Sequence, residues 1–168
     1  MAPETRQKAR VTLPRDDQIL ITRDFAAPRD RVYRAYTNPE LVALWWHADR
    51  GTIDSIEIDL CVGGRWRYAM TADGGFPVVF HGEYLEIVPA QKIRSTEVFE
   101  GMPAAAATST VTFTDSPVGT TLAILVQHKN QANRDAHLRS GMEDGLQAAL
   151  DHLEEVAAGD AGRGGVSR

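Results

Sequence analysis

The sequence predicts an α+β fold in which a curved antiparallel β-sheet wraps around a long C-terminal α-helix. One observation is an apolar stripe in residues 133–158, whose members stand three or four positions apart on one helix face: Leu138, Met142, Leu146, Ala149, Leu153 and Val156. Another is a run of strand-like segments at hairpin spacing between residues 51 and 128. Finally, strands and helices are segregated along the chain, which favours an antiparallel sheet over a parallel one.

The chain opens with a polar, basic segment, residues 1–18, which is predicted to be a flexible tail because it has no apolar run. Residues 19–27 follow as the first predicted strand, although Arg23 interrupts its apolar alternation. Two prolines then mark helix starts, since proline is favoured in the first turn. We therefore expect two short helices after the first strand, beginning at Pro28 and Pro39.

Apolar side chains at period two predict the rest of the sheet. The clearest alternation places Trp66, Tyr68 and Met70 on one face, and Asp73-Gly74-Gly75 suits a hairpin turn. The segment after Gly51 is imperfect around Asp54-Ser55. Together with the strand at 19–27 we expect about six or seven strands. The predicted ranges are 53–58, 65–70, 78–88, 93–99, 108–114 and 120–128.

The C-terminal helix is predicted to be one element from an N-cap at Asn133 to Ala158, with Gly159 as its stop signal. At 1.5 Å per residue it would be about 35–40 Å long, so its stripe needs a large surface to cover it. Gly141 and Gly145 stand one turn apart inside it, at a cost of about 1 kcal/mol each relative to alanine. Either close packing on the sheet or room for a ligand would explain them.

Composition is that of one globular domain. The chain has 168 residues, 43% of them hydrophobic, and we expect a single domain at 19–158 between the tail at 1–18 and a Gly-rich tail at 159–168. The net charge of −5 offers no attraction to nucleic acid or to an anionic membrane, so neither is expected as a partner. No apolar run reaches the roughly 18 residues that a membrane span needs.

Cysteine and motif content narrow the chemistry. Cys61 is the only cysteine, which excludes an intramolecular disulfide and favours a cytoplasmic location. No Cys/His cluster has zinc-ligand spacing and no nucleotide-binding loop or Ser/His/Asp order is evident. We therefore expect no metal and no cofactor, and the sequence leaves open whether the chain forms a homodimer.

Several motifs carry a resemblance to a known group of proteins: VYRAYTNPELVALWW (32–46), VGGRWRY (62–68), HGEYLEIVP (81–89), STEVFEG (95–101) and SGMEDGLQAALDHL (140–153). In these motifs and in its order of elements, the chain resembles the START-related (SRPBCC) superfamily. Within it, the chain is similar to the activator-of-heat-shock-ATPase-homologue-like group of single-domain bacterial proteins. The resemblance covers residues 19–158. It implies a helix-grip fold, with a cavity between the sheet and the C-terminal helix, and many relatives carry Trp where this chain has Leu146.

The resemblance implies several functions rather than one, because relatives bind lipids, hormones or polyketides and some catalyse cyclisation or hydrolysis. Our first interpretation is binding of a small, mostly apolar or amphipathic molecule in the cavity. The second is a small-molecule cyclase or hydrolase that uses cavity carboxylates. The third is a chaperone-regulating interaction protein. The sequence does not decide between binding and catalysis.

Candidate site residues follow from strand alternation and the helix stripe. The predicted ligand-binding residues are Trp46, Trp66, Tyr68, Met70, Glu83, Glu97, Phe99, Met142 and Leu146. The candidates for acid–base chemistry are His81, Glu83 and Glu97, and an inward carboxylate would have its pKa raised by desolvation. Alternatively, these three face water or join a cross-strand network with Arg65, Arg67 or Arg94. His47 is either a polar pocket group or a solvent-facing histidine.

Overall fold

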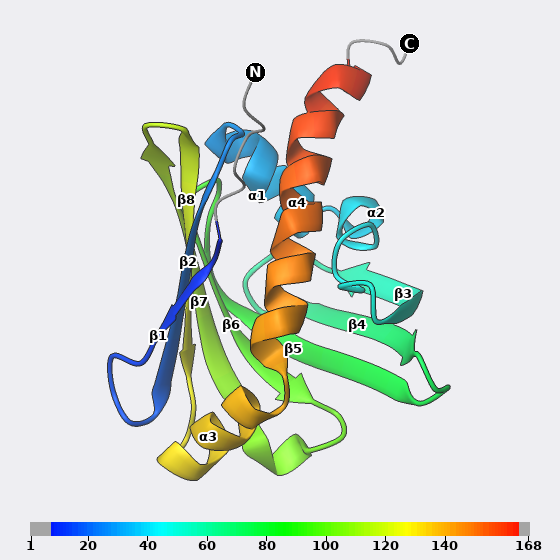
Figure 1. The fold of residues 1–168 in the computed structure, drawn as a ribbon, viewed down its shortest axis with the longest axis vertical. Coiled ribbons are helices and arrows are strands. Elements are labelled where there is room, and N and C mark those ends of the chain that lie inside the picture. Colours follow the sequence, from blue (N-terminus) through cyan, green and yellow to red (C-terminus); the bar gives the residue numbers. More distant parts are fainter. Residues whose placement is uncertain (1–7, 165–168) are drawn as a thin grey trace.

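A computed structural model describes the backbone of residues 8–164 and the side chains of residues 8–159. Its centre is one eight-stranded antiparallel sheet with the order β1-β2-β8-β7-β6-β5-β4-β3, which curves around the helix α4 (Figure 1). The strands are β1 Arg10–Thr12, β2 Gln18–Phe25, β3 Gly51–Ile58, β4 Arg65–Ala72, β5 Pro77–Val88, β6 Lys92–Phe99, β7 Ala107–Ser116 and β8 Gly119–Gln127. The helices are α1 Arg29–Thr37, α2 Pro39–Val42, α3 Gln131–Arg139 and α4 Met142–Gly164, with a 3-10 turn at Pro103–Ala105. The predicted fold class is confirmed.

The first strand and the two short helices agree with prediction. Alternate residues of β2 are buried, and α1 follows directly after Pro28. Asn38 ends α1 and caps α2, because its side-chain oxygen accepts hydrogen bonds from the backbone N–H groups of Glu40 and Leu41. The irregularity expected near Asp54 is a register shift between β3 and β4.

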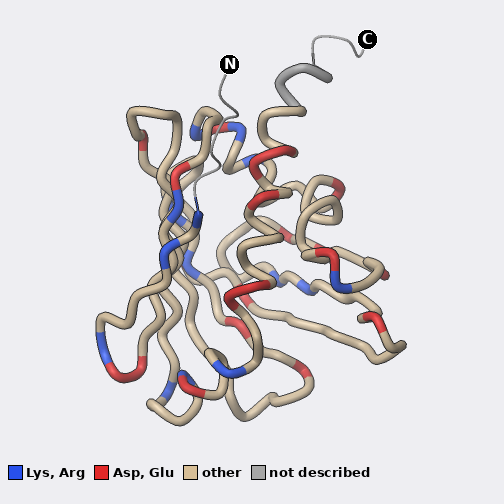
Figure 2. The backbone as a smooth tube through the Cα atoms, in the orientation of Figure 1, with Lys and Arg blue, Asp and Glu red and all other residues tan. Residues whose placement is uncertain are grey.

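Arg23, which interrupts the apolar pattern of β2, is buried with its apolar neighbours. It lies against α4, whose residues 142–159 carry acidic side chains and no Lys or Arg (Figure 2). Its guanidinium group contacts the carboxylates of Asp151, at 3.1 Å, and Glu154, at 3.0 Å. Glu154 also accepts the backbone N–H of Ala26 at 2.8 Å. The residue that interrupts the apolar pattern of β2 is therefore a charged side chain that holds α4 against the sheet.

The N-terminal tail prediction is wrong in part, because residues 10–12 form the edge strand β1 on β2. Ala9 is buried and makes two hydrogen bonds to the Gln147 side chain of α4, at 3.0 Å through its N–H and 2.8 Å through its C=O. This short strand raises the count above the six or seven expected. Its three residues are too few to show a period, which is why the pattern missed it. Residues 1–7 lie outside the described residues.

The single C-terminal helix is also corrected. The helix is interrupted between α3 and α4 at Gly141, whose φ of 82° is a left-handed conformation that glycine adopts without strain. The N-cap is Asn130 rather than Asn133, since its side chain accepts the backbone N–H of Asn133 at 2.8 Å. The helix passes Gly159 and continues to residue 164, so the predicted C-terminal tail begins too early. Residues 165–168 are not among those described.

The core lies between the concave face of the sheet and the helices α1 and α4 (Figure 1). Its fully buried side chains come from both layers and include Phe25, Phe113, Leu150, Leu153 and Val32. The group that packs against Gly145 on α4 is not one that we expected. A Cβ at this position would stand 3.0 Å from the guanidinium of Arg50. Among the described helices, none has the length and apolar character to cross a membrane.

Candidate functional site

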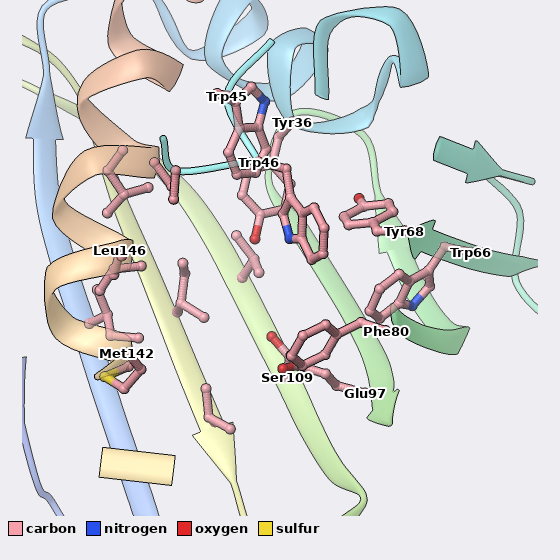
Figure 3. A pocket seen from close by; sticks show the side chains of 18 of the residues that line it. Tyr36, Trp45, Trp46, Trp66, Tyr68, Phe80, Glu97, Ser109, Met142 and Leu146 are labelled. Atoms are coloured by element: carbon pink, nitrogen blue, oxygen red, sulfur yellow. The ribbon is translucent and has the colours of Figure 1, made fainter. Parts of the chain in front are cut away.

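A cavity of about 320 Å³ separates part of the sheet from α4. Figure 3 shows Met142 and Leu146 of α4 on one side and a group of aromatic rings on the other. The helix side is apolar because the stripe at Met142, Leu146, Ala149 and Leu150 faces it. This volume falls within the usual range of sites for small molecules, about 300–1,000 Å³.

The aromatic side of the cavity is a continuous set of ring contacts. Trp46 packs edge-on against Tyr68, with centroids 5.3 Å apart, and against Phe80 at 5.9 Å. Trp66 contacts Tyr68 at 4.8 Å. The neighbouring Trp45 is 5% exposed, and its indole N–H donates to the carbonyl of Ala35 at 2.9 Å, so it fixes the segment after α2 while Trp46 faces the cavity.

One carboxylate lies among these apolar groups. Glu97 of β6 lines the cavity, and burial raises its pKa from 4.5 to about 6. No described residue forms a hydrogen bond or ion pair with its side chain. Burial and, secondarily, this carboxylate raise the pKa of the Tyr36 hydroxyl, which also lines the cavity. Ser95 and Ser109, partners across β6 and β7, add two more polar groups to the lining.

A second unpaired group belongs to Trp66. Its indole N–H is buried and has no hydrogen-bond partner among the described residues. Gly82 of β5 lies beneath the indole, and a Cβ there would stand 2.6 Å from this nitrogen and 1.8 Å from the carbonyl oxygen of Thr96. The glycine therefore allows the ring to lie flat across the sheet. A buried N–H without a partner is uncommon in native proteins and calls for an explanation.

Two histidines close the cavity where α3 meets it. His137 lines the cavity, and its Nδ1 lies 3.0 Å from Nε2 of His128. Burial, and then the charge of His128, lower the pKa of His137 to about 4. His137 is therefore neutral near pH 7, and one ring of the pair donates to the other.

Most of the predicted ligand-binding side chains lie at the cavity: Trp46, Trp66, Tyr68, Met70, Glu97, Met142 and Leu146. Phe99 is not in the lining but packs behind Phe80, with centroids 5.0 Å apart. Glu83 was placed wrongly, since it is exposed on the outer face of β5. The reason is the register of β5, which turns Gly82 and Tyr84 inward and so turns their neighbours outward.

His81 shares the outer face with Glu83. Its Nδ1 lies 2.9 Å from the Glu100 carboxylate, which also contacts Arg67 at 3.3 Å. The cross-strand network weighed as the alternative is thus present, although Glu100 was not expected in it. Of the candidates for acid–base chemistry, Glu97 alone lies in the cavity.

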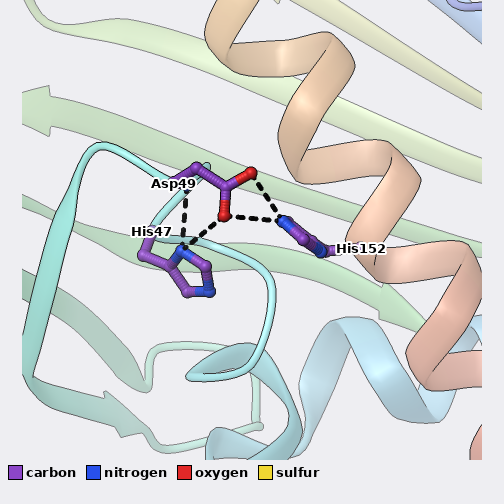
Figure 4. A group of neighbouring side chains, drawn as sticks. All are labelled: His47, Asp49 and His152. Atoms are coloured by element: carbon purple, nitrogen blue, oxygen red, sulfur yellow. Dashed lines mark hydrogen bonds and ion pairs between the residues drawn. The ribbon is translucent and has the colours of Figure 1, made fainter.

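Sequence reasoning missed several lining residues. Tyr36 and Phe80 line the cavity but were not among the predicted ligand-binding residues. Ser95 shares the inward face of β6 with Glu97, so the alternation could have found it. A cluster of three side chains was also missed as a group: His47, Asp49 and His152 offer atoms within 4.8 Å of one another that could hold a metal ion (Figure 4). His47, which was weighed as a pocket group or a solvent-facing histidine, is among the cavity-lining residues. His152 is too distant in sequence from the other two for any spacing motif.

Comparison with known proteins extends these observations. The sequence model of the family described as "Activator of Hsp90 ATPase homolog 1-like protein" matches residues 26–158. A crystal structure from Rhodobacter sphaeroides has a TM-score of 0.84 at 22% identity, covering 90% of this chain and 99% of that one. One from Chromobacterium violaceum has a TM-score of 0.71 at 29% identity, covering 85% and 98%. A solution structure titled as an AHSA1-like protein, from Aeromonas hydrophila, has a TM-score of 0.67 at 20% identity, covering 86% and 94%. No curated protein matches the sequence.

Proposed function

The chain belongs to the Activator of Hsp90 ATPase homolog 1-like family, and from that premise we propose that it binds a small, mostly apolar molecule between its sheet and α4. The observation that carries the proposal is a cavity of about 320 Å³ with apolar walls and one carboxyl group, Glu97, that no described side chain pairs. An unpaired carboxyl group among apolar walls is costly, so a ligand that pairs with it recovers part of that cost.

The chemistry of these groups constrains the ligand. Its apolar body would lie along Met142 and Leu146, where the helix offers only hydrocarbon and thioether surface. Its polar end would donate a hydrogen bond to Glu97. A hydroxyl group donates in this way, and the proposed ligand class is therefore an amphipathic molecule with an apolar body and a hydroxyl-bearing end.

Native mass spectrometry of the freshly purified protein tests the proposal directly, because a retained molecule appears as an added mass. In parallel, a fluorescent fatty-acid analogue is titrated into the delipidated protein, and long-chain alcohols and matched alkanes compete for it. We expect saturable binding of the probe at one site and stronger competition by the alcohol than by the alkane. Absence of both a retained mass and saturable probe binding would refute the proposal.

A second candidate function, acid–base catalysis on the bound molecule, is favoured by the pKa of Glu97. A value of about 6 lets this carboxyl group exchange a proton near neutral pH, as a general acid or base requires. If the retained molecule changes mass on incubation with the parent protein but not with Glu97→Gln, the protein is an enzyme. If it stays unchanged while Glu97→Gln weakens its binding, Glu97 only holds the ligand. The chaperone-regulating alternative stays a prediction.

A further inference from the structure

A cluster of three side chains joins the loop after α2 to the helix α4. Nε2 of His152, on α4, lies 2.9 Å from both carboxylate oxygens of Asp49. Nδ1 of His47 lies 3.9 Å from Asp49 Oδ1, and the two histidine rings have centroids 5.3 Å apart (Figure 4). Two ring nitrogens and one carboxylate oxygen therefore point at a common region from two separate segments of the chain.

Each histidine is oriented by a second partner on its other ring nitrogen. Nε2 of His47 lies 3.1 Å from the carbonyl oxygen of Leu44, to which it can donate, and Nδ1 of His152 lies 3.3 Å from the Glu155 carboxylate. Metal-binding histidines characteristically donate their distal N–H to a carbonyl or carboxylate in this way, which fixes the tautomer and aims the free lone pair at the metal. In this structure Asp49 occupies both facing nitrogens: Nε2–H of His152 donates to its carboxylate, and Nδ1 of His47 accepts its backbone N–H at 2.9 Å. A metal ion would take the place of these hydrogen bonds.

The loop holds this arrangement in an unfavourable backbone conformation. Ala48 and Asp49 have φ values of 53° and 60°, in the left-handed region that non-glycine residues rarely adopt. The cost is of order 1–2 kcal/mol per residue, and aspartate tolerates the region better than alanine. The turn is closed by the backbone N–H of Arg50, which donates to the carbonyl of His47 at 2.9 Å, and this bond holds His47 and Asp49 on either side of Ala48.

We propose that His47, Asp49 and His152 form a binding site for a divalent transition-metal ion, with Zn²⁺ as the best match to the ligand set. Zn²⁺ takes histidine nitrogen and carboxylate oxygen at about 2.0–2.2 Å, which places tetrahedral ligand atoms about 3.3–3.5 Å apart. The three ligand atoms already lie within 4.8 Å of one another, so side-chain rotations close the site. Water takes the fourth position, because the cluster is half-buried to exposed.

The surrounding charge favours a cation at this place. Residues 142–159 of α4, whose side chains are described, carry five acidic side chains and no Lys or Arg: Glu143, Asp144, Asp151, Glu154 and Glu155. The nearby cation, Arg50, is held elsewhere, since its guanidinium donates to the carbonyl of Gly141 at 3.0 Å and packs over Gly145. Gly145 precedes His152 by about two helical turns, roughly 10 Å. Metal binding would fix the 47–50 loop to α4, and this loop forms part of the cavity wall.

Titration calorimetry with Zn²⁺ on the untagged full-length chain tests the site. All proteins carry Cys61→Ser, because the exposed Cys61 thiol is a competing zinc ligand. The test variants are His152→Gln and Asp49→Asn, the latter because asparagine keeps the left-handed backbone while losing the charge. The matched control is His81→Gln, which removes a histidine that is also paired with a carboxylate but lies on the outer face of the sheet.

We expect one equivalent of Zn²⁺ to bind the parent and the control in the micromolar range or tighter. Each test variant should bind at least tenfold more weakly. At about 100-fold excess over its dissociation constant, Zn²⁺ should raise the melting temperature of the parent and control by about 5–10 °C, and that of the test variants by much less. Circular dichroism establishes that the variants fold.

Two results would overturn the proposal. One is the absence of stoichiometric Zn²⁺ binding by the parent, in which case the cluster is an ion pair that ties the loop to α4. The other is unchanged Zn²⁺ affinity in both folded test variants, which would place the metal elsewhere. Both results come from metal titration, so neither depends on whether the cavity binds the fluorescent probe.

Discussion

Replacing Leu146 by tryptophan separates an open cavity from a packed core at the centre of the molecule. Leu146 lines the cavity from α4, opposite the aromatic rings. An indole in this space would bury about 50–100 Å² more apolar surface than leucine, worth about 1–2.5 kcal/mol. For a domain of this size that corresponds to a rise in melting temperature of about 2–10 °C. The same side chain occupies the space that the ligand needs, so affinity should fall.

The assay compares thermal melts and fluorescent fatty-acid titrations of the parent, Leu146→Trp and Leu13→Trp. Leu13 is 48% exposed and far from the cavity lining, so its replacement introduces the same indole without filling the space. We expect Leu146→Trp to keep or raise the melting temperature and to weaken probe binding at least tenfold, while Leu13→Trp changes neither. Overpacking typically costs about 1–3 kcal/mol. A fall in melting temperature of about 2–10 °C would therefore show that the space beside Leu146 is filled.

Three further predictions concern charge and packing. The pKa of Glu97 is higher in the folded state than in the unfolded state, so the folded protein holds this proton more tightly. Glu97 therefore lowers the free energy of unfolding by an amount that grows as pH rises from 4.5 through about 6. Glu97→Gln should then be more stable than the parent at pH 7.5 by about 1–2 kcal/mol and similar at pH 4.5 in urea unfolding, whereas exposed Glu83→Gln changes little; an equal effect at both pH values would contradict the assignment. Arg23→Met leaves Asp151 and Glu154 facing the sheet without their buried guanidinium partner and should cost about 3–5 kcal/mol. The control Arg29→Met removes a largely exposed ion pair and should cost under about 1 kcal/mol, and equal losses would show that Arg23 is no special anchor. Gly82→Ala places a methyl group against the Thr96 carbonyl and the Trp66 indole and should cost at least about 1–3 kcal/mol in melting experiments, so a neutral result would mean that β5 and β6 can separate freely here.

The sequence predicted the fold class because period-two and period-3.6 patterns report which faces are buried, and burial alternates regularly along strands such as β2 and β8. The sequence predicted contacts less well wherever a polar or charged side chain takes part in the packing. Arg23 looked like a break in a strand and is instead buried on the apolar face, since carboxylates of α4 neutralise it. Gly145 was explained either by close packing on the sheet or by room for a ligand, while its neighbour is Arg50, nearly a hundred residues away.

The site residues also divide into those that the apolar pattern could place and those that it could not. Trp66, Tyr68 and Met70 were found because alternation alone determines their face, but the direction of β5 could not be fixed in the same way. Large side chains occur at both odd and even positions of β5, so they would lie on both faces of the strand. Only the pairing with β4 decides that Gly82 and Tyr84 face inward. His81 and Glu83 were therefore equal candidates with Glu97 until the register was known.

The cavity and the proposed metal site depend on the same geometrical fact, the path of the loop from residue 47 to residue 50 along α4. Arg50 holds this loop at the beginning of the helix, and the contact between Asp49 and His152 holds it about two turns later. The loop directly follows Trp46, so its position sets how far that indole reaches over Tyr68 and Phe80. Loosening the contact between Asp49 and His152 should therefore let Trp46 move, and an ion bound there would restrict it. A molecule bound in the cavity would then meet an aromatic wall whose position depends on Asp49 and His152, which are not among the lining residues.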